Sequence, residues 1–214
     1  MTPVRPDIDI TGLVLAGGRG SRMGGLDKGL QDFAGEPLAL RALQRLAPQV
    51  HRVMLSANRN LLSYEFFGAP VVTDALPDHP GPLAGFLAGL RHCETPCMLT
   101  VPCDAPNFPP DLAQRLADAM KAQRADIAMA SAPELQPDGS RRLRPQPVFC
   151  LLRTTLQGSL AAFLEGGGRK VSAWTAQHAV AMVPFDQPDD APDAFFNANT
   201  QAELQSIAPS RPIF

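Results

Sequence analysis

The chain has 214 residues, of which 45% are hydrophobic and 19% charged, and its formal net charge is −2. This length predicts one domain with a sizeable core, and the near-balanced charge argues against a generally basic nucleic-acid binder. No apolar run reaches the ~18 residues that a transmembrane helix needs, so the sequence predicts none. The 17 glycines and 22 prolines exceed the usual share, which makes their positions informative.

Short β-rich runs alternate with helical patterns along the chain. We predict strands over 10–15, 52–57, 70–73, 97–101, 126–131, 146–152 and 179–183. We predict helices from Pro37 to Pro48, around 83–90, from 112 to 120, over 155–165, and from a capping box at 200–203. This alternation predicts an α/β fold with three layers, in which helices cover both faces of a mostly parallel central sheet.

Three local expectations can be compared directly with a structure. The first helix is expected to bury a stripe of Leu40, Leu43 and Ala47. Residues 132–145 are polar with Pro, Gly and Arg, and are expected to form an exposed loop. We expect a flexible N-terminus over 1–9, a single domain over 10–208, and a flexible tail over 209–214.

The cysteines and histidines show no catalytic or metal-binding spacing. The four cysteines form no C-x-x-C pair, and a predicted strand separates Cys97 from Cys103 by about 20 Å. Zinc is therefore disfavoured, and buried free thiols in a reducing cytoplasm are expected. The four histidines are expected on the surface or in structural roles.

The loop after the first strand carries six of the 17 glycines, between Gly17 and Gly29. The loop does not match a dinucleotide-binding fingerprint, because Met23 stands where that motif requires a glycine. It does not match a P-loop either, because Asp27 stands where the P-loop requires a glycine. Glycines nevertheless let backbone N–H groups turn toward an anion, and residues 16–28 hold three basic residues against one acidic. This composition predicts a phosphate site rather than a plain connector.

Polar side chains follow three other predicted strands. Asp104 comes after a buried apolar strand, where a carboxylate can hold Mg²⁺ beside phosphates, although a helix cap or Asx turn is the simpler alternative. Asn58 and Asp74 end two further strands, where each alone would be typical of a turn. Because ligands bind at the carboxyl ends of strands in such folds, these residues are expected on one rim.

This ordered set of motifs resembles the molybdenum cofactor guanylyltransferases. The residues that carry the resemblance are Leu15-Ala16-Gly17-Gly18, Arg22-Met23-Gly24-Gly25, Asp27-Lys28, Ala57-Asn58-Arg59, Asp74, Gly81-Pro82-Leu83-Ala84-Gly85, Pro102-Cys103-Asp104 and Asn197-Ala198-Asn199-Thr200. The resemblance spans about residues 10–205. It implies a Rossmann-like nucleotidyltransferase domain that joins GMP from GTP to the molybdopterin form of the molybdenum cofactor and releases pyrophosphate.

The resemblance also implies roles for individual residues. GTP is expected at Leu15, Ala16, Gly17, Gly18, Lys28, Asn58, Asp74 and Asp104, with Mg²⁺ at Asp104 and with Asn197 and Asn199 toward the pterin. Lys28, Asp104 and Arg22 are the expected catalytic residues, since phosphoryl-type transfer depends on positioning and charge neutralisation. We expect a cytoplasmic monomer in transient contact with proteins that supply or receive the cofactor, and no nucleic-acid or membrane partner.

Other functions stay open at this point. The same cofactor could receive CMP, although the intact Leu-Ala-Gly-Gly and Gly-Pro-Leu-Ala-Gly segments favour GTP. A sugar-1-phosphate nucleotidyltransferase shares a glycine-rich first loop, and a nucleotide or cofactor carrier would bind without catalysis. Residues 166–170 (Gly-Gly-Gly-Arg-Lys) either stop a helix or meet the pterin phosphate, and Arg141, Arg142 and Arg144 lie in the predicted exposed loop.

Overall fold

The computed structural model describes residues 5–17, 27–74, 81–136, 138–197 and 203. Within these residues seven strands form one sheet in the order β5-β4-β1-β6-β8-β7-β9. The strands are β1 (Ile10–Leu15), β4 (Arg52–Ser56), β5 (Val71–Val72), β6 (Cys97–Pro102), β7 (Ile127–Leu135), β8 (Arg141–Arg153) and β9 (Val180–Pro184). A small second sheet pairs β2 (Asp32–Phe33) with β3 (Glu36–Pro37).

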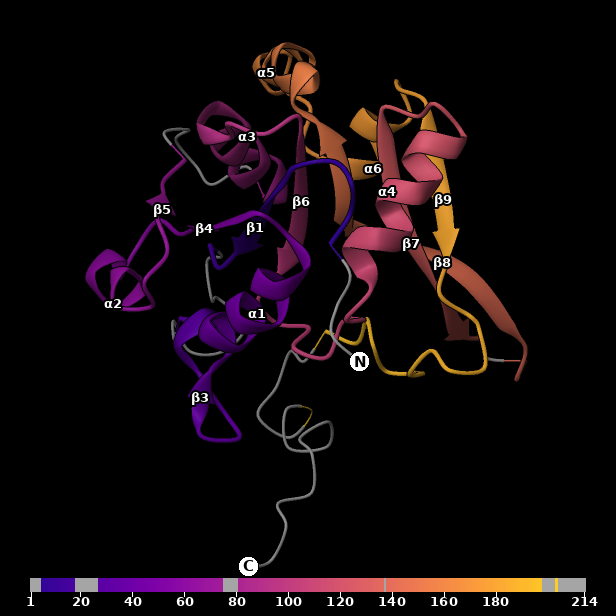
Figure 1. The fold of residues 1–214 in the computed structure, drawn as a ribbon, viewed down its shortest axis with the longest axis horizontal. Helices are drawn as coiled ribbons and strands as arrows, with labels where there is room; N and C mark the ends of the chain where they lie inside the picture. The colour runs from indigo at the N-terminus through magenta and orange to yellow at the C-terminus, as the bar shows by residue number, and fades with distance from the viewer. Residues whose placement is uncertain (1–4, 18–26, 75–80, 137, 198–202, 204–214) are drawn as a thin grey trace, which may run out of the picture.

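The helices cover both faces of the large sheet, as Figure 1 shows. They are α1 (Leu38–Leu46), α2 (Leu61–Glu65), α3 (Pro82–His92), α4 (Leu112–Ala122), α5 (Gln157–Glu165) and α6 (Val171–Thr175), with 3₁₀ turns at Lys28–Leu30, Ala47–Gln49 and Thr154–Leu156. One core lies between the sheet and α1 with α4, and the other between the sheet and α3, α5 and α6. The expected three-layer α/β fold is therefore confirmed.

The central strands end at the same level, so the residues that follow them lie at one edge of the sheet. Leu15, the last residue of β1, is in register with Ser56 of β4 and with Pro102 of β6, and both pairings are parallel. The apolar character of these strands follows from burial on both faces. Only β8 runs antiparallel to its neighbours in this sheet, between β6 and β7.

The expected exposed loop over 132–145 is wrong. β7 continues to Leu135 and β8 begins at Arg141, so most of the segment is a two-stranded ribbon that extends past β9, whose last pairing is Ser131 with Pro184 (Figure 1). The prolines that suggested a loop are tolerated because the ribbon has no third strand. Exposed Arg144 and Glu134 form an ion pair of 3.1 Å across it.

The buried stripe of α1 also differs from the expected one. Leu40 and Ala47 are half-buried, and the buried face consists of Leu38, Ala39, Ala42, Leu43 and Leu46. The helix lies close to β1, because a Cβ added at Gly12 would stand 2.5 Å from Leu46 Cδ2. Small alanines on this face permit the close approach, and a search for large apolar residues overlooks them. In contrast, the large apolar residues of α4, which are Leu112, Leu116 and Met120, are all buried.

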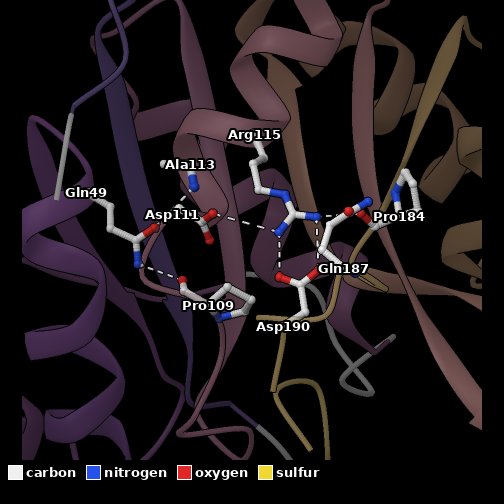
Figure 2. A network of polar contacts seen from close by, with 8 residues as sticks. All are labelled: Gln49, Pro109, Asp111, Ala113, Arg115, Pro184, Gln187 and Asp190. Atoms are coloured by element: carbon white, nitrogen blue, oxygen red, sulfur yellow. Dashed lines mark hydrogen bonds and ion pairs between the residues drawn. The ribbon is translucent and has the colours of Figure 1, made fainter. Parts of the chain in front are cut away.

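The segment after β9 is held against α4 by Arg115, as Figure 2 shows. Arg115 donates hydrogen bonds to both carboxylate oxygens of Asp190, at 2.6 and 3.2 Å, and to the Pro184 carbonyl at 2.6 Å. Its guanidinium also stacks on the Phe185 ring, 3.7 Å from the centroid. Phe195 closes an aromatic cluster with Phe185 and Phe149. These contacts fix the segment that leads to Asn197.

The cysteine thiols are mostly buried, and the described histidines form hydrogen bonds within the fold. All four cysteines are free; Cys97, Cys103 and Cys150 are buried and Cys93 is half-buried. Burial raises the pKa of Cys97 to about 11, so this thiol stays protonated. Three histidines bond to nearby groups: His51 with the Ile10 amide, His92 with the Ala88 carbonyl and His178 with Ser159. His79 lies outside the described residues.

Other expectations fall partly outside the described residues. The predicted helix at 200–203 is described only at Glu203, which is helical. Residues 1–4 and 204–214 are not described, so the expectations for both chain ends remain predictions. No helix among the described residues is long and apolar enough to cross a membrane.

Candidate functional site

A cavity of about 300 Å³ opens at the carboxyl ends of the central parallel strands. The loop after β1 contributes Leu15, Ala16 and Gly17, and the segment at the end of β6 contributes Pro102 to Asp104. Lys28 and Asp74 approach the cavity from two further segments. The level ends of β1, β4 and β6 therefore produce the concave edge that the fold predicts for a ligand.

The start of α3 forms another wall of the cavity. Gly81 has φ +85°, which glycine adopts without strain, and Pro82 supplies the first helical residue. The unpaired N–H groups at such a helix start favour a negatively charged ligand. Gly85, one turn later, has no room for a side chain, since a Cβ would stand 2.7 Å from Leu15 Cδ2 and 2.9 Å from Ser56 Oγ.

Lys28 and Asp104 meet at this cavity although 75 residues separate them in the chain. Lys28 Nζ lies 2.7 Å from Asp104 Oδ2, and the two side chains are 23% and 21% exposed. The second oxygen, Asp104 Oδ1, is buried and has no hydrogen-bond partner among the described residues. A buried carboxylate oxygen without a partner is costly, so this atom is suited to a cation or a ligand donor.

Asn58 and Asp74 form the second polar pair. Asn58 Nδ2 donates to Asp74 Oδ2 at 2.6 Å, and the Asp74 amide donates to Asn58 Oδ1 at 3.0 Å. The segments after β4 and β5 are thereby joined. Asp74 Oδ1 is buried and lacks a partner among the described residues, as Asp104 Oδ1 does. Each polar pair thus keeps one acceptor for a ligand.

Cys103 also lines the cavity, but it is not an activated nucleophile. Burial, followed by the negative charge of Asp104, raises the pKa of the Cys103 thiol far above its usual range. Nucleophilic cysteines react as thiolates, so a thiol held protonated is inert at neutral pH. Cys103 instead fixes the loop, because its amide donates to the Leu15 carbonyl at 3.1 Å.

The structure brings most of the sequence-predicted residues together. Those that line the cavity are Leu15, Ala16, Gly17, Lys28, Asp74 and Asp104, and Asn58 bonds to Asp74. Asn197 is exposed and does not line this cavity. Gly18, Arg22 and Asn199 lie outside the described residues, so their predicted roles remain predictions.

Sequence reasoning missed two residues that line the cavity and the role of one buried residue beside Lys28. Ser56 and Val148 line the cavity, and neither residue type carries a signal of function. The third is Asp27, whose carboxylate is buried beside Lys28. Its position directly before the phosphate-site lysine, in the Asp27-Lys28 motif, was the available signal, but sequence reasoning assigned the carboxylate itself no role.

Residues 166–170 follow the helix-stop interpretation. Gly167 has φ +86°, and the Gly167 and Gly168 amides donate to the Leu164 and Phe163 carbonyls of α5. This pattern is a Schellman motif. Arg169 adds a hydrogen bond of 2.9 Å to the Leu164 carbonyl. Helix termination alone therefore accounts for the glycines and for this arginine.

Comparisons with known proteins agree with this geometry. The family model of the MobA-like NTP transferase domain matches residues 12–189. A protein of Acidovorax sp. (strain JS42) named molybdenum cofactor guanylyltransferase is 66% identical over 93% of this chain and 95% of its own. A protein of the same name from Bordetella pertussis is 58% identical, over 93% and 96% of the two chains.

Solved structures share the fold at low identity. Molybdopterin-guanine dinucleotide biosynthesis protein A from Archaeoglobus fulgidus superposes with a TM-score of 0.72 at 21% identity, over 92% of this chain and 96% of that one. A CMP:2-keto-3-deoxy-manno-octonic acid synthetase complexed with CTP gives 0.67 at 14% identity, over 94% and 96%. The fold therefore does not distinguish a guanine from a cytosine nucleotide.

Proposed function

We propose, because this chain belongs to the family of MobA-like NTP transferase domains, that it transfers GMP from GTP to the molybdopterin form of the molybdenum cofactor. The products are the guanine dinucleotide cofactor and pyrophosphate. Relatives of 58–66% identity bear the name of this activity. The structural observation that carries the proposal is the meeting of Lys28 and Asp104, 2.7 Å apart, at the cavity formed by the strand ends.

The reaction needs charge neutralisation more than proton transfer. An oxygen of the acceptor's phosphate monoester attacks the α-phosphorus of GTP, the bond between the α-phosphorus and the bridging oxygen breaks, and pyrophosphate leaves. A phosphate monoester with a second pKa near ~6 is already mostly ionised at neutral pH, so no general base is required. Lys28 faces the cavity and neutralises charge that gathers on the leaving group.

Asp104 fits Mg²⁺, which typically uses one or two carboxylates together with substrate oxygens. Its buried Oδ1 has no partner among the described residues, and Oδ2 is shared with Lys28. Bound Mg²⁺ would supply additional positive charge to the phosphates. The pairing of Lys28 with Asp104 keeps both charges compensated until nucleotide binds, because a partly buried unpaired charge is costly.

Asp74 and Asn58 are proposed to read the base. Guanine presents N–H donors that suit a carboxylate acceptor, and Asp74 Oδ1 is such an acceptor. Asn58 orients this carboxylate by donating a hydrogen bond to Asp74 Oδ2, and it also accepts one from the Asp74 amide. Guanine offers a ring N–H and an amino group side by side, whereas cytosine offers only its amino group, which supports GTP over CTP.

A pyrophosphate-release assay with GTP, CTP, ATP and UTP, Mg²⁺ and molybdopterin cofactor tests the proposal. Release is expected with GTP and is expected to fall to background when the acceptor is omitted. Asp104→Asn is expected to lower turnover strongly and to raise the Mg²⁺ concentration needed for half-maximal turnover. Turnover with CTP but not GTP would refute the base assignment, and tight GTP binding without transfer would favour a carrier.

We further propose that the chain acts as a monomer in the cytoplasm and meets the proteins that supply or receive the cofactor only transiently. The four free cysteines support a reducing compartment. Light scattering of the purified chain at several concentrations tests the monomer. A mass near twice 22.9 kDa would refute it.

A further inference from the structure

The carboxylate of Asp27 is buried next to the cavity-lining Lys28, and it is not among the residues assigned to the nucleotide so far. Its side chain is only 5% exposed. It directly precedes Lys28 and caps the 3₁₀ turn Lys28–Leu30, because Oδ1 accepts a hydrogen bond of 3.2 Å from the Gly29 amide. A buried carboxylate requires partners, and Asp27 finds the others in a different part of the chain.

Those partners come from the segment after β4, which also carries Asn58. Tyr64 of α2 donates its hydroxyl to Asp27 Oδ1 at 2.6 Å, and Asn60 donates Nδ2 to Oδ2 at 2.9 Å. Arg59 Nε lies 3.9 Å from the same Oδ2. One carboxylate therefore joins the Lys28 turn to the segment that begins at Asn58.

The local structure is built closely around this junction. A Cβ added at Gly29 would stand 2.4 Å from the Tyr64 hydroxyl, so only glycine lets the turn approach the phenol. Asn60 has φ +52°, a left-handed conformation that asparagine tolerates better than most residues. Burial, and then the hydrogen bond to Asp27, raises the pKa of Tyr64 far above its usual range, so the phenol remains a donor.

The contacts of Asp27 link the polar residues of the two segments that border the cavity. Asp74 bonds to Asn58, and Asn60, two residues further on, bonds to Asp27. Asp27 precedes Lys28, which pairs with Asp104. The residues proposed to read the base and those proposed to meet the phosphates are therefore linked through hydrogen bonds and short stretches of main chain.

We propose that Asp27 is a positioning residue, which sets Lys28 toward the triphosphate through its hydrogen bonds with Tyr64 and Asn60. This inference rests on the proposed function, because it takes the ligand to be a nucleoside triphosphate. Asp27 itself touches neither substrate nor metal. Its action goes through the Lys28 turn, and it ties that turn to the base-reading segment.

Tyr64→Phe tests the inference by removing one hydrogen bond while retaining the ring and its edge contact with Phe67. The matched control is Thr11→Val, which removes the buried hydrogen bond between Thr11 and Thr95 Oγ1 atoms, 2.8 Å apart. That pair lies at the amino end of β1, remote from the cavity. Both variants lose one buried hydrogen bond, so a merely structural role predicts the same binding behaviour in both.

The readout is the ratio of GTP to GMP affinity, measured by titration calorimetry for the full chain. GMP keeps the base and one phosphate, so its affinity is expected to stay within about twofold in Tyr64→Phe. The GTP affinity is expected to fall about three- to tenfold, and kcat about tenfold or more, since small displacements of catalytic groups have effects of this size. Thr11→Val is expected to change neither the ratio nor kcat.

An unchanged ratio in Tyr64→Phe, with a loss of thermal stability equal to that of Thr11→Val, would overturn the inference. Asn60→Gly provides a second variant should the first fail to fold: it removes the donor to Oδ2 at an exposed position and tolerates the left-handed backbone. Its expected result is the same selective loss of GTP affinity. The binding ratio needs no acceptor, so absent turnover in the unsubstituted chain would count against the proposed function alone.

Discussion

Arg115 and Asp190 form a bidentate ion pair that ties α4 to the segment after β9 (Figure 2). The Arg115 side chain is 23% exposed and the Asp190 side chain 11%, so water screens this ion pair less than it screens a pair on the surface. Because Arg115 also bonds to the Pro184 carbonyl and stacks on Phe185, one side chain fixes the segment that leads to the exposed Asn197.

Arg115→Gln is therefore expected to lower the free energy of unfolding by about 1.5–3 kcal/mol, the range for lost hydrogen bonds to a charged group. Urea denaturation followed by circular dichroism measures this change. The control is Arg52→Gln, since Arg52 pairs with Glu94 at 2.6 Å while both side chains are mostly exposed. It should cost less than ~1 kcal/mol. Equal losses in the two variants would contradict a larger contribution of the Arg115 contacts to stability.

The same pair predicts a pH dependence of stability. Burial works against ionisation of Asp190, but the hydrogen bonds from Arg115 and from the Gln187 amide outweigh it and lower the pKa of Asp190. A lowered pKa in the folded state contributes stability above the usual carboxyl pKa of 3.8, and this contribution disappears as pH falls through the folded value. The difference in denaturation midpoint between the native chain and Asp190→Asn, measured between pH 7 and pH 2.5, should therefore narrow as the pH falls below 3.8. A constant gap down to pH 2.5 would refute this dependence.

Lys28→Met is expected to reduce kcat/KM for GTP by roughly 10²- to 10³-fold, because removing one aligned charged or hydrogen-bonding group in a transition state has effects of this size. Steady-state pyrophosphate release measures it. The stem of the side chain remains, so the comparison isolates the ammonium group. Lys121→Met on the exposed side of α4 is the control and should retain full activity. A Lys28 variant with unchanged kcat/KM would remove this residue from the mechanism.

Two glycines of α3 provide a matched test of whether nucleotide binds in the cavity. A Cβ at Gly85 would meet Leu15 and Ser56, which line the cavity, whereas one at Gly89 would meet Leu13 and Met98 within the core. Both Gly→Ala changes are expected to destabilise the chain by about 1–3 kcal/mol through overpacking. Only Gly85→Ala should weaken GTP binding in titration calorimetry. Equal affinities for GTP in the two variants would argue against a nucleotide in this cavity.

The predictability of the elements followed the strength of their patterns. The buried strands at 10–15 and 97–101 were predicted nearly to their ends, because both faces of a central parallel strand are apolar. The ribbon over 132–145 was missed, because pairing between exposed polar strands leaves no hydrophobic alternation. The short helix α2 (Leu61–Glu65) was also missed, since five residues span little more than one turn.

The candidate site was predictable where chemistry is local to a strand end. Asn58, Asp74 and Asp104 were expected on one rim, and the structure places Asp74 and Asp104 at one cavity with Asn58 bonded to Asp74. Asp27 was noticed only as the neighbour of Lys28 in a motif, and nothing in the sequence indicated what its carboxylate binds. Its partners Asn60 and Tyr64 lie more than 30 residues away, and a side-chain hydrogen bond between distant segments leaves no periodicity in a sequence.

The sequence by itself determined the α/β class, the order of the principal strands and helices, and the residue types that gather at the strand ends. Composition and periodicity are sufficient for this, because burial selects apolar residues locally along each element. Only the tertiary structure decided that Lys28 pairs with Asp104 and that Asn58 pairs with Asp74. It also decided that Asp27 joins their two segments, because packing between elements far apart in the chain sets such distances.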